Sequence, residues 1–172
     1  GYEESYGYLS GTHARDKDAV VASMLFAEMA CYYTYKNISL FDKLNSLFDR
    51  FGYFVESSKS IAFKGLDGME KMVAIMKKFK DTDLSEVAGV PMISKLDLEA
   101  GMVKYFEDGR IETSDLPSAN VIKYEFGDDE WLCIRPSGTE PKLKIYVSTK
   151  AETKQKSVER NMKLQSAIES MI

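Results

Sequence analysis

A heptapeptide between two alternating apolar stretches carries the strongest chemical signal in this sequence. Residues 135–141 read Arg-Pro-Ser-Gly-Thr-Glu-Pro. The guanidinium of Arg135 offers two parallel N–H donors that match two oxygens of a phosphate, and the hydroxyls of Ser137 and Thr139 add two short donors. Gly138 has no Cβ, so the backbone N–H groups beside it can approach an anion closely. These residues predict a phosphate-binding loop, and a proline-bounded hairpin connection with incidental polar residues is an equally weighted alternative.

A second polar group lies at the beginning of the chain, where residues 1–7 read Gly-Tyr-Glu-Glu-Ser-Tyr-Gly. Carboxylates such as that of Glu3 accept hydrogen bonds from sugar hydroxyls, and the hydroxyl of Ser5 can donate and accept. The adjacent carboxylates of Glu3 and Glu4 make a poor metal site without further oxygen ligands. Residue types alone favour a solvated loop over a sugar site by about two to one, since polar residues are mostly exposed.

A third cluster, residues 13–18, reads His-Ala-Arg-Asp-Lys-Asp. Arg15 and Lys17 are able to bind an anion. Lys17 would become a proton-transfer group only if desolvation lowered its pKa. From residue types alone, a capped helix start with exposed charges is the favoured interpretation. His13 is the single histidine of the chain, which excludes a metal cluster built from histidines.

Composition narrows the class of protein. The 172 residues are 44% hydrophobic and 29% charged, with a formal net charge of -4, which fits a globular protein and argues against nucleic-acid binding. No apolar run is long enough to cross a bilayer and no signal peptide opens the chain, so we expect no membrane partner. Cys31 and Cys133 are isolated in apolar surroundings, which predicts buried thiols in a reducing, cytoplasmic compartment. Because Gly1 begins inside a polar motif, we expect a fragment of a longer protein.

The first third of the chain is expected to be loop over residues 1–15, followed by two helices. Asp16 or Asp18 caps the first helix, which runs to about Tyr35. Apolar residues cover most of its circumference, so we expect it to be largely buried. Asn37 or Ser39 starts the second helix, and Gly52 ends it.

Beyond Gly52 the pattern changes to that of an α+β unit, a mostly antiparallel sheet with helices packed on one face. We expect Asp67 to open a helix and residues 151–171 to form another. The apolar residues expected to face inward from these helices are Met69, Met72, Val73, Met76 and Phe79, then Val158, Met162, Ala167, Ile168 and Met171. The segments expected to be extended are 53–63, 90–98, 102–112, 121–126, 130–135 and 143–148.

Three stretches in this order resemble the C-terminal part of the α-D-phosphohexomutase family, and most closely its bacterial phosphoglucomutase members. They read GYEESYGYLSGTHARDKDAVVASML at the start, LPSANVIKYEF in the middle and WLCIRPSGTEPKLKIYV near the end. The resemblance covers essentially the whole chain. It implies that residues 1–51 are the C-terminal part of the family's third domain, a piece of an α/β domain. Residues 52–172 would be the fourth domain, which is TATA-binding-protein-like.

The resemblance implies an enzyme that interconverts hexose 1-phosphate and hexose 6-phosphate through a bisphosphorylated sugar such as glucose 1,6-bisphosphate. Glu3 and Ser5 would hold sugar hydroxyls, with Arg15 and Lys17 facing the site. The distal phosphate would be bound by Arg135, Ser137, Gly138 and Thr139.

The family's phosphoserine and its Mg²⁺ loop have no counterpart here, so we expect this fragment to be inactive without the N-terminal domains of the same chain. Lys17 is the one candidate for a catalytic residue. Gly7 stands where some phosphomannomutase-type members have a histidine, which favours the gluco branch. The alternative is a stand-alone module that binds phosphosugars or phosphate without catalysis.

Overall fold

The computed structural model describes residues 1–3 and 6–172. The chain divides into two compact units, Gly1–Phe51 and Gly52–Ile172.

The first unit begins with a short hairpin where a loop was expected. Strands β1 (Tyr2–Glu3) and β2 (Gly7–Tyr8) pair antiparallel, with Tyr2 opposite Tyr8 and Glu3 opposite Gly7. A ladder of two residues per strand is too short to produce a detectable alternation of apolar side chains, so the sequence pattern did not indicate it.

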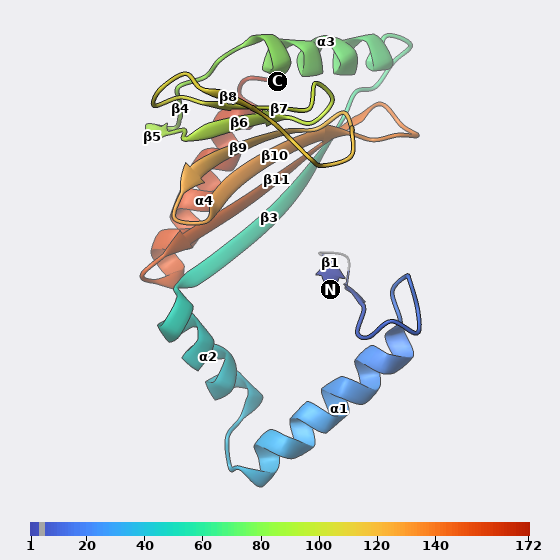
Figure 1. The fold of residues 1–172 in the computed structure, drawn as a ribbon, viewed down its shortest axis with the longest axis vertical. Coiled ribbons are helices and arrows are strands. Elements are labelled where there is room, and N and C mark those ends of the chain that lie inside the picture. Colours follow the sequence, from blue (N-terminus) through green and yellow to red (C-terminus); the bar gives the residue numbers. More distant parts are fainter. Residues whose placement is uncertain (4–5) are drawn as a thin grey trace. The chain divides into compact units, whose positions relative to one another are not determined.

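Two helices follow the hairpin (Figure 1). Both begin at side chains that were predicted as caps. Helix α1 spans Ala19–Tyr35, and the Asp18 carboxylate accepts hydrogen bonds from the backbone N–H groups of Val20 and Val21 at 2.9 and 3.1 Å. Helix α2 spans Leu40–Phe51, where Ser39 Oγ accepts from the backbone N–H of Asp42 at 3.0 Å. Both caps satisfy donors that a helix N-terminus otherwise leaves unpaired.

The expected burial of α1 is wrong. None of its residues is buried, and Val20 and Phe26 are 80% and 60% exposed. A helix with apolar side chains around its circumference needs partners on more than one side. The described part of this unit offers only α2 and a two-residue ladder.

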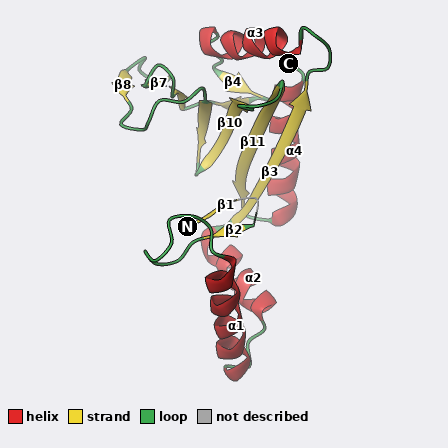
Figure 2. Ribbon diagram, turned by 90° about the vertical axis from the view of Figure 1, so that its right-hand side faces the viewer, coloured by secondary structure: helices red, strands yellow, loops and turns green. Residues whose placement is uncertain are grey.

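The second unit is built on a seven-stranded sheet in the order β3-β11-β10-β9-β6-β7-β8 (Figure 1). Figure 2 shows β3, β11 and β10 of this sheet side by side. Every neighbouring pair in it is antiparallel, as the α+β prediction requires. The strands of this sheet are β3 (Tyr53–Ala62), β6 (Ser94–Asp97), β7 (Met102–Tyr105), β8 (Ile111–Thr113), β9 (Ile122–Gly127), β10 (Glu130–Pro136) and β11 (Lys142–Ala151). A separate pair consists of β4 (Glu86–Val87) and β5 (Val90–Pro91). The helices are α3 (Gly68–Asp81) and α4 (Lys154–Glu169).

One face of the sheet carries the core, and both helices contribute to it. The strand register places Tyr124 opposite Leu132, and Leu132 opposite Val147, so these side chains share a face. The α+β architecture with helices on one face is therefore confirmed. The fully buried residues of this core include Phe79, Ile122, Tyr124, Leu132, Ile134, Leu143, Ile145, Val147, Leu164 and Ile168.

The inward faces of the helices differ in part from the apolar pattern. Met69 and Val73 of α3 are 52% and 60% exposed, and Met162 of α4 is 64% exposed. In α4 the buried positions include polar Ser157 and Asn161. The Asn161 side chain donates to the carbonyls of Val55 and Val147 at 2.9 and 3.1 Å, and a buried amide is stable where such hydrogen bonds are made.

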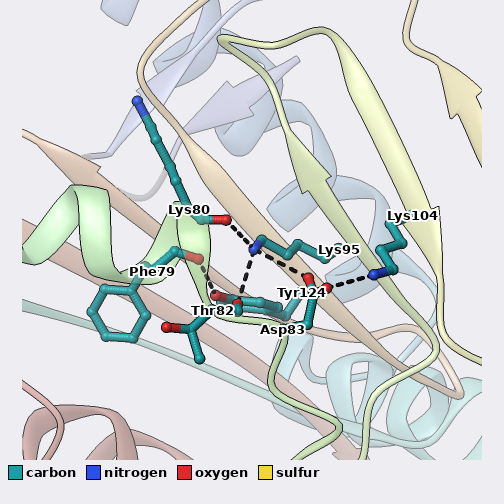
Figure 3. Close-up of polar contacts among 7 residues, drawn as sticks. All are labelled: Phe79, Lys80, Thr82, Asp83, Lys95, Lys104 and Tyr124. Carbon is teal, nitrogen blue, oxygen red and sulfur yellow. Dashed lines mark hydrogen bonds and ion pairs between the residues drawn. The ribbon is translucent and has the colours of Figure 1, made fainter.

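The C-terminal end of α3 is tied to the sheet by a buried lysine (Figure 3). Lys95 of β6 is 5% exposed, and its ammonium donates to the carbonyls of Lys80 and Thr82 at 2.6 and 3.0 Å. The carboxylate of Asp83 lies 3.6 Å from the same ammonium, and the Tyr124 hydroxyl donates to the carbonyl of Phe79 at 3.3 Å. A cation at a helix C-terminus satisfies orphan carbonyls and is favoured by the helix dipole.

Candidate functional site

The predicted phosphate loop is the connection between β10 and β11, and hydrogen bonds hold both of its ends. The backbone N–H of Ser137 donates to the carbonyl of Lys142 at 2.8 Å. The carbonyl of Pro141 accepts from the backbone N–H of Phe63 at 2.8 Å, which attaches the loop to the chain just beyond β3. Arg135 lies near the end of β10, so a rigid strand determines where its side chain begins.

Inside the loop, local contacts arrange the polar groups. The Ser137 hydroxyl lies 3.5 Å from the backbone N of Thr139. The Lys142 ammonium donates to Glu140 Oε2 at 2.7 Å, so this lysine already has a counterion. A Cβ added to Gly138 would meet no atom within 4 Å. The space beside Gly138 is therefore open to a ligand approaching the backbone.

A second cation stands directly beside Arg135. The register of β10 and β11 places Lys144 opposite Arg135, and Lys144 also lies opposite Ser60 of β3. Arg135 is exposed and Lys144 half-buried, and neither forms an ion pair with any residue that the structure describes. Like charges directly opposite on a sheet repel each other, and an anion bound between them would remove that repulsion.

Sequence reasoning missed Lys144, although a signal for it was present. Leu143 and Ile145 are buried, so the alternation of β11 sends Lys144 to the opposite face. Arg135 is likewise out of phase with buried Ile134. That Arg135 lies directly opposite Lys144 depends on the register of the antiparallel ladder. The alternation of apolar and polar residues does not specify that register.

The first unit gathers a separate set of predicted site residues. Glu3, Gly7, Arg15 and Lys17 line a concavity of about 240 Å³. Lys17 Nζ lies 3.3 Å from Glu3 Oε1 and 3.5 Å from Asp16 Oδ1. The predicted contact residue Ser5 lies outside the described residues.

The electrostatics of Lys17 oppose the role of proton acceptor. Its hydrogen bond to Glu3 raises its pKa, and the negative charges of Asp16 and Glu3 act in the same direction. Proton transfer by Lys17 would require a lowered pKa. Since the pKa is raised instead, Lys17 stays protonated, and its ammonium is suited to donate hydrogen bonds and supply charge.

His13 stabilises the entrance to α1. Its Nε2 lies 2.9 Å from Asp18 Oδ2, and the backbone N–H of Asp18 donates to the carbonyl of Tyr8 at 2.8 Å. The backbone N–H of Val21, and then His13, lower the pKa of the Asp18 carboxyl. Asp18 thus joins the helix cap to the hairpin that carries Glu3.

The described residues show neither a metal-binding cluster nor a helix able to span a membrane. That part of the chain contains no group of three or more His, Cys, Asp or Glu side chains placed to hold a metal ion. None of its helices combines the length and the apolar character needed to span a bilayer.

The fold and the loop together define a class: an α+β domain that presents an arginine and hydroxyl donors at the tip of an antiparallel strand pair. Comparison with family models is more specific. Residues 70–164 match the model of the phosphoglucomutase/phosphomannomutase C-terminal domain, and residues 1–51 match that of the phosphoglucomutase/phosphomannomutase alpha/beta/alpha domain III. The chain belongs to the phosphoglucomutase/phosphomannomutase family, as its resemblance to the phosphohexomutases predicted.

Curated relatives agree with this assignment. A phosphoglucomutase from Staphylococcus epidermidis is 36% identical over 148 residues, which is 86% of this chain and 27% of the relative. A phosphoglucomutase from Staphylococcus aureus is 34% identical over 149 residues, again covering 27% of the relative. The chain therefore spans about a quarter of the length of these curated relatives.

A solved structure supports the fold. The open form of pp63/parafusin, a phosphoglucomutase from Paramecium, aligns with 98% of this chain and 29% of its own, at a TM-score of 0.59 and 17% sequence identity. At that identity the likeness concerns the fold alone.

Proposed function

We propose that this chain is the part of a phosphoglucomutase-type enzyme that binds the sugar hydroxyls and the non-transferring phosphate of a hexose phosphate. The complete enzyme interconverts hexose 1-phosphate and hexose 6-phosphate through a bisphosphorylated sugar such as glucose 1,6-bisphosphate. Family membership supports the reaction class. The observation that carries the binding role is the cross-strand pair of Arg135 and Lys144, which has no counterion among the described residues.

The phosphate is held by charge and by short donors. Arg135 donates two parallel N–H groups to two phosphate oxygens, and Lys144 adds a second positive charge. The hydroxyls of Ser137 and Thr139 and the backbone beside Gly138 complete the cradle. Because the loop is anchored at both ends, little conformational entropy is lost when the ligand binds.

The sugar is recognised by the predicted site residues of the first unit. Glu3 accepts hydrogen bonds from hydroxyls, Ser5 donates or accepts, and Arg15 and Lys17 supply positive charge near the ring. A reaction that exchanges the two ends of the sugar requires the substrate to bind in two orientations. Contacts to hydroxyls and to the distal phosphate, rather than to the anomeric carbon, tolerate both orientations and supply the positioning on which phosphoryl transfer depends.

The phosphoserine that gives and receives the phosphoryl group is proposed to lie in the N-terminal domains of the complete enzyme, together with the Mg²⁺ ligands. Mg²⁺ bound there would stabilise the charge on the transferring phosphoryl group. The residues described here include no such ligand group. The predicted burial of the thiols is wrong for Cys31, which is exposed, while Cys133 is half-buried. We place the enzyme in the cytoplasm, a reducing compartment in which isolated thiols stay unpaired.

The proposal is tested by Arg135→Ala in the complete enzyme with glucose 1-phosphate as substrate. We expect kcat/KM to fall by about a hundredfold or more, the cost of one charged contact made in the transition state. The matched control is Arg110→Ala, since Arg110 is an exposed arginine of the same unit that is paired with Asp108 and Glu112. Equal activities of the two variants would refute the binding role.

A further inference from the structure

The aliphatic part of Lys17 passes directly over Gly7. A Cβ built on Gly7 would lie 2.1 Å from Lys17 Cδ, 2.7 Å from Lys17 Cγ and 2.6 Å from Glu3 Oε1. Cβ atoms in proteins essentially never approach other heavy atoms below 3.0 Å. A side chain at position 7 and the observed position of Lys17 therefore exclude each other.

The backbone at this position does not itself demand glycine. Gly7 lies in β2 and is absent from the residues with positive φ, whereas Gly11, four residues later, has φ of +78°. An alanine is therefore compatible with the chain conformation at position 7. What an alanine would disturb is the packing of Lys17 and Glu3.

The consequence of this packing is an ion pair on the wall of a polar concavity. Lys17 Nζ lies 3.3 Å from Glu3 Oε1, and Glu3, Gly7 and Lys17 all line the same concavity of about 240 Å³. An ammonium has three donors and no acceptor, while a carboxylate has only acceptors. A hydroxyl both donates and accepts hydrogen bonds. The Lys17 ammonium and the Glu3 carboxylate together supply a donor and an acceptor for the adjacent hydroxyls of a ligand.

We propose that Gly7 is a positioning residue: its missing Cβ allows Lys17 to lie against Glu3, and the resulting pair binds the neighbouring hydroxyls of a polyhydroxylated ligand. The identity of the ligand rests on the proposed function. The contact between Gly7 and Lys17 does not rest on the proposed function. The positioning role of Gly7 and the proposed function can therefore be refuted separately.

The first test follows the ion pair without substrate. In the complete enzyme, the acetylation rate of each lysine by acetic anhydride is measured by mass spectrometry for wild type and for Gly7→Ala. The pair keeps Lys17 protonated and slow to react, so Gly7→Ala should increase the rate at Lys17. Lys163, an exposed lysine of the second unit, serves as an internal reference. An unchanged rate at Lys17 overturns the proposal, whatever the enzyme's activity.

The second test is a double-mutant cycle on KM. We expect Gly7→Ala to raise KM for glucose 1-phosphate about tenfold in wild type, but less than about twofold in a Lys17→Ala background, because the displaced side chain is then absent. An equal effect in both backgrounds overturns the proposal. If Gly7→Ala fails to fold while Gly7→Ala/Lys17→Ala folds, steric conflict with Lys17 is supported. If both fail to fold, glycine is required for another reason and the proposal is wrong.

Discussion

Lys142 and Lys144 lie two residues apart on β11, on the same face of the strand, yet their charges are differently placed. Lys142 donates to Glu140 at 2.7 Å. Lys144 stands opposite Arg135 and has no carboxylate partner among the residues described. An anion gains little from a cation that already has a counterion and more from one that has none. Whether a charged side chain in this loop region binds an anion strongly therefore depends on whether it already has a counterion.

This difference leads to a prediction for paired variants of the complete enzyme. Lys144→Met should weaken binding of hexose phosphate about tenfold, the loss of one charged hydrogen-bonding partner. Lys142→Met should change affinity less than about threefold, since it removes a neutralised surface pair. Isothermal titration calorimetry at two salt concentrations measures both affinities. Equal losses for the two variants would show that proximity to the loop, and not the missing counterion, determines the effect.

Among the secondary-structure elements, α3 shows how a buried charged side chain can cap the C-terminus of a helix. Lys95 reaches the carbonyls at the end of α3 from β6, across the core face of the sheet (Figure 3). Burial lowers the pKa of Lys95, and the nearby Asp83 opposes this shift only in part. The protonated form is therefore less favourable in the folded unit than in the unfolded chain.

The sign of the pH dependence follows from this shift. Between the lowered pKa of folded Lys95 and its ordinary value of 10.5, the unfolded chain binds more protons, so the free energy of unfolding should rise with pH. Lys95→Met should remove this rise. It should also lower stability at neutral pH by about 2 kcal/mol, because it removes the hydrogen bonds from a charged donor to the carbonyls of Lys80 and Thr82.

The measurement is urea unfolding of wild type and variant from pH 7 to pH 10. Lys77→Met is the matched control, because Lys77 lies on α3 in an exposed ion pair with Asp81 and should change stability by less than about 0.5 kcal/mol. If the free energy of unfolding of Lys95→Met rises with pH in parallel with that of wild type, the assigned role of Lys95 is wrong.

The two units of the molecule differ in how much apolar surface they bury. The unit Gly52–Ile172 contains all the buried apolar core side chains among the described residues, whereas α1 and α2 contain no buried residue. Burial of apolar surface is the main favourable contribution to folding. The second unit should therefore be stable alone, and the first should depend on further chain to cover its apolar side chains.

Separate expression of residues 52–172 and 1–51 tests this expectation. The longer piece should unfold in one cooperative thermal transition and show a dispersed NMR spectrum. The shorter piece should show no cooperative transition. A cooperative, dispersed residues 1–51 would contradict the expectation, as would a residues 52–172 piece that binds hydrophobic dyes and lacks fixed tertiary structure.

Local patterns were sufficient for much of the fold. The segment 121–126 was expected to be extended and contains most of β9. A cap at Asp16 or Asp18 and a helix end at Gly52 were expected, and the structure has the cap at Asp18 and the end of α2 at Phe51. These signals are local, because a strand or a cap is determined by residues within a few positions of one another. The family, too, could be predicted, since its motifs are continuous segments of the chain.

The burial of individual helix residues depended on contacts with segments distant in sequence. The buried face of α4 includes Asn161, because two sheet carbonyls accept its hydrogen bonds, and a hydrophobic pattern cannot anticipate such partners. The expected burial of α1 failed since burial depends on a neighbouring surface and not on composition.

By itself, the sequence determined most strands of the large sheet, the approximate helix starts and the types of residue in both polar loops, because these depend on side chains close together along the chain. Only the tertiary structure decided that Lys144 faces Arg135, that Lys17 lies over Gly7 with a raised pKa, and that Lys95 closes α3. Each of these is a contact between segments separated in sequence. Antiparallel register and packing create such contacts, and no local pattern encodes the distance between two side chains that meet in this way.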